Sequence, residues 1–400
     1  MSMRVRGATF AAGLCTAAVL AFSSPTIAGT SYSESVIGTF ENSNGLEPTL
    51  GTPAFDDFSH PVGVTAEGGT SNAGVIYEAV GPGELNALWS FSGSYPDGQA
   101  LPSSPINYKG TIFGVSTSAL WAIIPDESNF QIVYSFFDHQ QAAPNAGVIA
   151  DGKGNFYGTN GDTIYELTAK SNYQKYKALY TLNGTTDGHI PTSELVRDKT
   201  GNLYGVTTYG GDFTNCQPGC GTVFKVTPRG AFSVLCAFTG GSDGGWPIGG
   251  LVMDKQGNLY GTTSSGGTTG AGAIYEAPAG GGCKTLYSFG GTIAHPKVDA
   301  SNPEATLTLI GSTLYGTSAG GGHGIGGTVF SYRIGSRKDN LLWSFCEGGG
   351  GNCTDGQASY SGLMNFGGAL IGTTAAGGDV NPNGPCGNSG CGTVFELTPQ

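Results

Sequence analysis

The stretch that decides the fold is Asp254–Thr263, which reads DKQGNLYGTT. Its Asp, Gly and Asn favour a tight turn, because they supply turn hydrogen bonds and positive φ angles. Strand-forming residues lie on both sides of this turn. We therefore interpret the stretch as a β-hairpin. The Asp then shapes the turn, although catalysis and calcium binding are the alternatives for such a residue.

Variants of this hairpin recur along the whole chain, and such internal repeats are the first thing to look for in a sequence. Neighbouring copies lie between 44 residues (Gly114 to Gly158) and 56 residues (Gly205 to Gly261) apart, measured on the glycine of the YGT-like core. This glycine occurs at Gly63, Gly114, Gly158, Gly205, Gly261, Gly316 and Gly372.

Each repeat contains four strand signals in a fixed order: G-L-x-x-D, N-L-Y-G-T-T, G-T-V-F-E-L and L-Y-S-F. Hairpins join the four strands, and a longer link with Asp-Gly and Pro, such as Asp243–Pro247, leads to the next repeat. A four-stranded antiparallel unit repeated radially predicts a β-propeller. We expect seven first strands, which begin near residues 48, 102, 145, 192, 249, 303 and 361.

The two ends of the repeat region complement each other. The last repeat stops at a third strand, Glu396–Pro399, and the chain opens with an unpaired fourth strand, Val36–Phe40. We expect the N-terminal strand to complete the last blade, because this would cover an otherwise bare sheet edge. The prediction is thus an all-β, seven-bladed propeller of four-stranded antiparallel blades, built as one domain over residues 29–400.

The first residues predict export. Arg4 and Arg6 precede the apolar run Ala8–Phe22, and residues 26–28 read TIA. These are the parts of a secretory signal peptide, so we expect residues 1–28 to be removed. No second apolar run reaches membrane length, so we expect no membrane insertion. The mature protein is predicted to be secreted or periplasmic.

Export makes disulfides permissible. Three cysteine pairs are close in sequence within Gly-rich loops, so we expect local bridges Cys216–Cys220, Cys346–Cys353 and Cys386–Cys391. Cys236 and Cys283 either pair or remain buried thiols. Zinc binding is the rival interpretation of the pairs, but no His or further Cys lies beside them at zinc-site spacing. We predict no metal and no cofactor.

The charge of the chain excludes one class of partner. The formal net charge is −12, and removal of Arg4 and Arg6 would make it −14. No basic cluster breaks this trend, so we expect no nucleic-acid partner. We expect a monomer.

The three recurring motifs carry a family resemblance. GNLYGTT (residues 257–263), GTVFELTP (392–399) and LYSF (286–289), the last followed elsewhere by a D-G-x-x-P link, resemble the GloVer tandem-repeat family of exported bacterial proteins. The resemblance spans Ser35–Gln400 and implies a secreted or surface repeat protein with no assigned activity. Members often end in an anchoring segment, and the absence of one before Gln400 favours free secretion or the periplasm.

Two matches to catalytic motifs lack the structural context that the chemistry needs. Gly316–Gly320 fits G-x-S-x-G, but a Gly-rich loop and a strand follow instead of a helix. Gly322, Gly324 and Gly327 fit G-x-G-x-x-G, but a strand follows there too, so no helix N-terminus is available for a dinucleotide.

The links between blades are the better candidates for a binding site, because they and the loops between second and third strands emerge on one face. There they would surround the mouth of a central channel, where a ligand site is expected. The alternative is that the link Asp residues bond only their own backbone. The candidate ligand-binding residues are Asp97, Asp187, His189, Asp243, Trp246, His295 and Asp355.

We consider three functions. The first is a non-enzymatic propeller that binds an extracellular or cell-surface glycan or protein, since no catalytic constellation is recognisable. The second is a secreted polysaccharide hydrolase or lyase at the channel mouth, with Asp187 or Asp243 as acid/base and a His as partner. Sugar hydrolysis needs two carboxylates about 5–10 Å apart. The third is a structural protein of the cell envelope.

Overall fold

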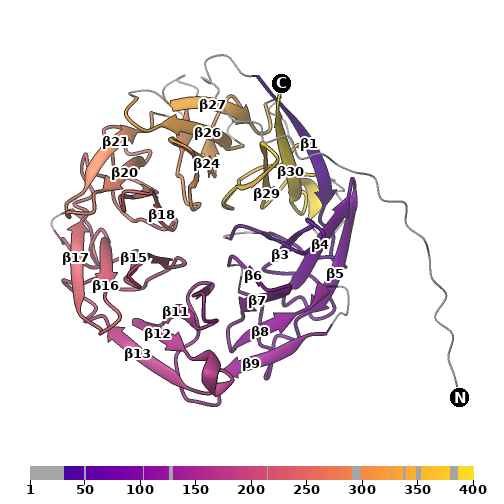
Figure 1. Cartoon of the computed structure of the whole chain (residues 1–400). Coiled ribbons are helices and arrows are strands. Elements are labelled where there is room, and N and C mark those ends of the chain that lie inside the picture. The colour runs from indigo at the N-terminus through magenta and orange to yellow at the C-terminus, as the bar shows by residue number, and fades with distance from the viewer. Residues whose placement is uncertain are drawn as a thin grey trace, which may run out of the picture. The chain divides into compact units, whose positions relative to one another are not determined.

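The structure is a computed structural model, and residues 31–400 of it form a ring of seven four-stranded antiparallel sheets (Figure 1). This confirms the predicted seven-bladed propeller. The described residues are 31–48, 51–101, 103–125, 129–213, 215–290, 299–324, 326–336, 339–347, 353–378 and 386–400.

The blades follow one another along the chain, and strands run from the inner to the outer edge of each blade. Blade 1 contains β2 (Ala54–Phe55), β3 (Pro61–Val64), β4 (Val75–Gly81) and β5 (Glu84–Ser90). Blade 2 contains β6 (Ile106–Tyr108), β7 (Thr111–Val115), β8 (Ala119–Ile123) and β9 (Gln131–Ser135). Blade 3 contains β10 (Ile149–Ala150), β11 (Phe156–Asn160), β12 (Thr163–Leu167) and β13 (Tyr176–Thr181).

The second half of the ring repeats this order. Blade 4 contains β14 (Val196–Arg197), β15 (Leu203–Thr207), β16 (Thr222–Val226) and β17 (Phe232–Ala237). Blade 5 contains β18 (Val252–Met253), β19 (Leu259–Thr263), β20 (Ala273–Ala277) and β21 (Lys284–Ser288). Blade 6 contains β23 (Thr308–Ile310), β24 (Thr313–Ser318), β26 (Thr328–Arg333) and β27 (Asp339–Ser344), with a short ladder of β22 (Ala300–Ser301) and β25 (Gly320–Gly321) beside it.

Blade 7 is made from both ends of the chain. It contains β28 (Met364–Phe366), β29 (Ala369–Thr374), β30 (Thr393–Pro399) and, at its outer edge, β1 (Tyr32–Thr39). In Figure 1 the indigo β1 lies beside the yellow β30, and the two pair antiparallel from Tyr32↔Pro399 to Thr39↔Thr393. The predicted ring closure is therefore confirmed.

The hydrophobic core lies between neighbouring blades. One cluster joins Val115 of blade 2 to Phe156 of blade 3, and another joins Val206 of blade 4 to Leu259 of blade 5. The recurring glycine of each second strand leaves room for the aromatic ring on the third strand of its own blade. A Cβ on Gly205, for example, would lie 2.6 Å from the ring of Phe224 on the third strand of the same blade.

The inner strands begin a few residues later than the sequence suggested; β2 starts at Ala54 and β28 at Met364. The residues just before the inner strands belong to no sheet ladder, and side chains of other blades hold them instead. Thr317 Oγ1, for example, donates to the Ser361 carbonyl at 2.8 Å.

All eight cysteines of the ring form disulfides. The local pairs Cys216–Cys220, Cys346–Cys353 and Cys386–Cys391 are present as predicted. Cys236 and Cys283 form the fourth bridge, across 47 residues, and are therefore not free thiols. It ties the outer strand of blade 4 to the residue before the outer strand of blade 5.

Helical turns in the described ranges are short, such as η2 (Ala169–Ser171). Within those ranges, no helix has the length and apolar character to cross a membrane.

Candidate functional site

The links and the loops between second and third strands share one face of the ring, which we call the link face. Short backbone bridges join them directly. His189 pairs with Tyr209, Gly245 with Ser265 and Gln357 with Ala376. In each case a link residue meets the loop of the blade that follows it. The turns within the first and last hairpins of each blade lie on the opposite face, the hairpin face.

The four predicted link aspartates each bind the backbone of their own link. The carboxylate accepts a hydrogen bond from the N–H two residues beyond the outer strand, and a glycine with positive φ follows each Asp. The N–H to carboxylate distances are 3.1 Å for Ser92–Asp97, 2.8 Å for Asn183–Asp187, 2.9 Å for Thr239–Asp243 and 3.1 Å for Cys346–Asp355.

These contacts give the link aspartates a structural task. Asp97 and Asp187 are only 5% and 6% exposed, and Asp187 also accepts from the Tyr180 hydroxyl at 2.8 Å. A buried carboxylate is stable when such donors satisfy it. A role of these residues in ligand binding stays a prediction.

The other three predicted residues are placed differently. Nδ1 of His189 lies 2.9 Å from both carboxylate oxygens of Asp162, in the turn between β11 and β12, and about two fifths of its side chain is exposed. Trp246 has a φ of 54° and packs against the cluster that contains Cys216 and Cys220. His295 lies outside the described residues. Within the described ranges, no hydrogen bond or ion pair joins any two of the predicted site residues.

An exposed aromatic pair on the link face was not predicted. Tyr95 comes from the link after blade 1 and Phe137 from the link after blade 2; they are 58% and 67% exposed. Their ring centroids are 5.7 Å apart. The signal in the sequence is that the link at 136–141 (FFDHQQ) lacks the Asp-Gly pair found in the links at Asp97, Asp187, Asp243 and Asp355.

Polar groups stand beside this pair. The Tyr95 hydroxyl donates to Asp138 Oδ2 at 3.2 Å, and this carboxylate raises the pKa of Tyr95. His139 bonds the Ser135 carbonyl through Nδ1 at 2.7 Å and stacks on Tyr134. If Nδ1 donates there, the neutral ring presents Nε2 as an acceptor. We call Tyr95, Phe137, Asp138 and His139 the aromatic platform.

The central channel is narrow. The segments before the inner strands of all seven blades line one cavity of about 100 Å³. Glu194 of blade 4 reaches across it, because its Oε1 accepts from the backbone N–H of Ser104 at 2.9 Å and of Gly147 at 3.3 Å. Ligand pockets are usually about 300–1,000 Å³, so this cavity has room only for a few water molecules or a small ion.

The cavity contains a carboxyl group whose pKa is raised. Burial raises the pKa of Glu304, and the pKa of Tyr360 is raised by burial and by the Glu304 carboxylate. Glu194, Glu304 and Tyr360 all line the cavity. Nothing in the sequence singled them out, because the segments that carry them were assigned to strands.

The described residues contain one group of three side chains that could together ligate a metal: Asp56, His60 and Glu78 of blade 1. It lies towards the hairpin face and involves none of the predicted site residues.

Comparison with known proteins identifies the repeat. The family described as the Gloeobacter/Verrucomicrobia repeat matches residues 116–330, which is more than half of the chain. This confirms the resemblance inferred from the motifs. No curated protein matches the chain.

Solved structures show the same fold at low identity. The extracellular domain of BT4673 from B. thetaiotaomicron, described as a hybrid two-component system, has 10% identity, a TM-score of 0.56, and coverage of 90% of this chain and 39% of that one. The corresponding domain of BT3049 has 10% identity, a TM-score of 0.54, and coverage of 90% and 40%. The chain thus spans about two fifths of these relatives.

A gluconolactonase from Xanthomonas campestris, XC5397, is 13% identical with a TM-score of 0.43, and the match covers 87% of this chain and 97% of that one. Likenesses of this size concern the fold and carry no argument about activity.

Proposed function

The chain belongs to the Gloeobacter/Verrucomicrobia repeat family, and we propose that it is an exported, non-enzymatic propeller that binds a neutral extracellular glycan on its aromatic platform. The observation that carries the proposal is the exposed pair of Tyr95 and Phe137, held on adjacent links at the same face. Exposed apolar groups that lie together on a soluble protein mark interaction sites.

The chemistry of the platform suits a sugar. The C–H face of a pyranose ring packs on an aromatic ring, while its hydroxyls need acceptors and donors at the edge. Asp138 Oδ1 receives no hydrogen bond from a described residue, so it is an available acceptor next to Tyr95. His139 adds a second polar group on the same link.

The size of the platform favours a glycan over a protein. Two aromatic side chains bury about 300–500 Å², whereas each partner of a stable protein complex buries about 800 Å². The net charge of −12 would repel an acidic polysaccharide, so a neutral glycan is the better ligand.

The disulfides support a place of action outside the cytoplasm. Four bridges in one ring are typical of an oxidising compartment. We propose that residues 1–28 are a signal peptide and that residues 29–400 are a single secreted or periplasmic domain that works as a monomer. The extracellular domains of similar fold support this location.

A polysaccharide hydrolase or lyase is the rival function, with envelope structure as a third. The small cavity and the satisfied link aspartates weaken the argument for catalysis in the channel. An array of neutral oligosaccharides tests the three together. We expect wild-type protein to bind a subset of neutral glycans without cleaving them, and Tyr95→Ala/Phe137→Ala to lose the signal. Cleavage of a glycan would contradict the proposal, as would binding that survives in this variant.

A further inference from the structure

The first hairpins of blades 3, 4 and 5 share one hydrogen-bonded arrangement. In blade 5, Asp254 Oδ1 accepts backbone N–H groups, while Oδ2 accepts from Asn258 Nδ2 at 2.9 Å and from the Tyr260 hydroxyl at 3.0 Å. Blades 3 and 4 repeat it with Asp151–Asn155–Tyr157 and Asp198–Asn202–Tyr204. Both carboxylate oxygens are satisfied in each case.

Blade 1 has the same hairpin without these two donors. Asp56 Oδ1 still accepts the backbone N–H of Phe58 at 2.9 Å and of His60 at 2.7 Å. His60 stands where the sibling hairpins have Asn, and Val62 stands where they have Tyr, as the pairing of β2 with β3 shows. Asp56 Oδ2 is therefore buried with no hydrogen-bond partner.

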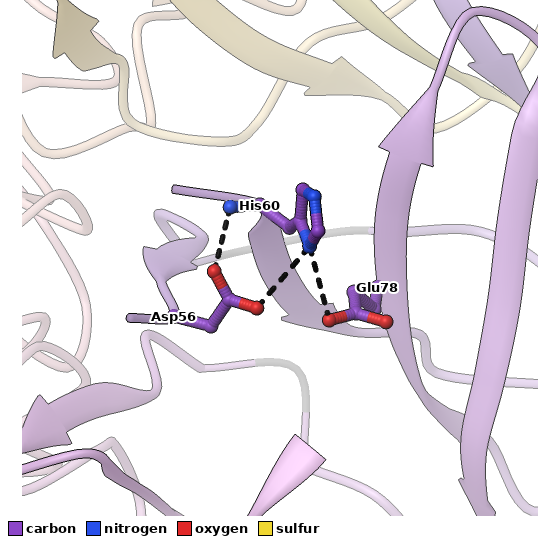
Figure 2. Close-up of side chains that lie close together, drawn as sticks. All are labelled: Asp56, His60 and Glu78. Carbon is purple, nitrogen blue, oxygen red and sulfur yellow. Dashed lines mark hydrogen bonds and ion pairs between the residues drawn. The ribbon is translucent and has the colours of Figure 1, made fainter. Parts of the chain in front are cut away.

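A second carboxylate faces the same point. Glu78 on β4 is paired with Val62, as Glu276 is paired with Tyr260 in blade 5. His60 Nδ1 lies 3.3 Å from Asp56 Oδ2 and 3.4 Å from Glu78 Oε1, and Figure 2 shows the three side chains converging. The side chains of Asp56 and Glu78 are 3% and 9% exposed.

From this geometry we propose that Asp56, His60 and Glu78 form a binding site for a divalent transition-metal ion, with Zn²⁺ as the best fit. The three ligand atoms lie within 4.8 Å of one another. Imidazole nitrogen and carboxylate oxygen at about 2.0–2.1 Å are established zinc ligands. Two ligands of a tetrahedral ion at that distance are about 3.3 Å apart, close to the separations of His60 from both carboxylates.

The charge balance supports a cation at this point. An imidazole nitrogen that faces two carboxylates carries either a proton or a metal ion, and two buried carboxylates require compensation. About a third of the His60 side chain is exposed, so an ion can enter from solvent and keep a fourth position open.

Calorimetric titration of tag-free, chelator-treated protein with Zn²⁺ tests the site, together with the melting temperature with and without the ion. We expect one Zn²⁺ per chain and a rise in melting temperature of a few degrees at saturation. His60→Asn/Val62→Tyr restores the sibling hairpin, so this variant should fold, bind no Zn²⁺ and show no shift.

Two further variants complete the test. Glu78→Gln should lose the ion, whereas His189→Asn, which removes the partly exposed His189–Asp162 pair, should keep it. Absence of Zn²⁺ binding to wild-type protein would overturn the proposal. Undiminished binding in His60→Asn/Val62→Tyr would overturn it as well.

Discussion

The same residue type serves different purposes at different points of this ring. Asp254 stabilises a hairpin turn, Asp187 accepts a hydrogen bond from the backbone of its own link, and Asp56 lies beside a second carboxylate. What separates them is the number of donors that each carboxylate meets. The sequence shows an Asp at each of these places, but it does not show which carboxylate oxygen remains without a donor.

The link aspartates should contribute to stability through these contacts with their own links. Asp187→Ala leaves the N–H of Asn183 and the hydroxyl of Tyr180 without their acceptor. We expect the free energy of unfolding to fall by about 1–3 kcal/mol, measured by chemical denaturation. Glu84→Ala, at the exposed start of β5, is the control and should change it by less than about 0.5 kcal/mol. Intact stability together with lost glycan binding in Asp187→Ala would reverse this assignment.

Asp339 should make stability depend on pH. Burial and the nearby Asp299 carboxylate raise its pKa to about 7, well above the ordinary value for an aspartate. Between these two values the folded state holds a proton that the unfolded state has lost, so stability falls as pH rises from about 4 to about 7.

Asp339→Asn removes this titration. We expect the variant to lose about 2 kcal/mol less stability than wild-type protein between pH 4 and pH 7, measured by urea denaturation at each pH. Parallel pH profiles for the two proteins would contradict the assignment.

At the scale of the element, the sequence predicted the hairpins well because their turns depend on local chemistry. The residues of the D-x-x-G-N turn and of the GTVF strand favour these conformations through their own local preferences. The segments before the inner strands, such as 359–363, were predicted as strands and are not, because contacts with other blades hold them. Cross-blade contacts leave no periodic signal in one sequence.

The strand β1 should hold the ring closed through its pairing with β30. A chain that starts at Asn42 would lack β1 and leave the edge of β30 without its partner. We expect the free energy of unfolding of this chain to be lower by more than about 3 kcal/mol, since a whole ladder of hydrogen bonds is lost. We also expect the chain to aggregate through the bare edge.

Thermal unfolding and size-exclusion chromatography measure both effects. A chain that starts at Ser31 is the control and should behave as the full chain does. A synthetic peptide of residues 31–41, added in trans, should restore part of the lost stability. A truncated chain that melts as the control does would show that β1 is dispensable.

At the scale of the whole molecule, what the blades share builds the ring and what differs between them provides the surface chemistry. The repeat, the number of blades and the closure could be predicted from the sequence, because they depend on recurring residues. The aromatic platform could not, because Tyr95 and Phe137 are 42 residues apart and stand in separate links. Only the ring of blades places the centroids of the two aromatic rings 5.7 Å apart.

The hairpin face offers a matched control for the platform. Phe58 and Phe366 are 62% and 48% exposed, which is comparable to Tyr95 and Phe137, but they lie on the other side of the blades. Substitution of Phe58 and Phe366 should therefore leave ligand binding on the link face unchanged.

The most direct test is therefore the dissociation constant of the best neutral glycan, measured by calorimetry for wild-type protein and two double variants. We expect Tyr95→Ala/Phe137→Ala to raise it at least tenfold, which is about 1.4 kcal/mol, and Phe58→Ala/Phe366→Ala to leave it unchanged. Equal dissociation constants for wild-type protein and Tyr95→Ala/Phe137→Ala would contradict the proposed platform.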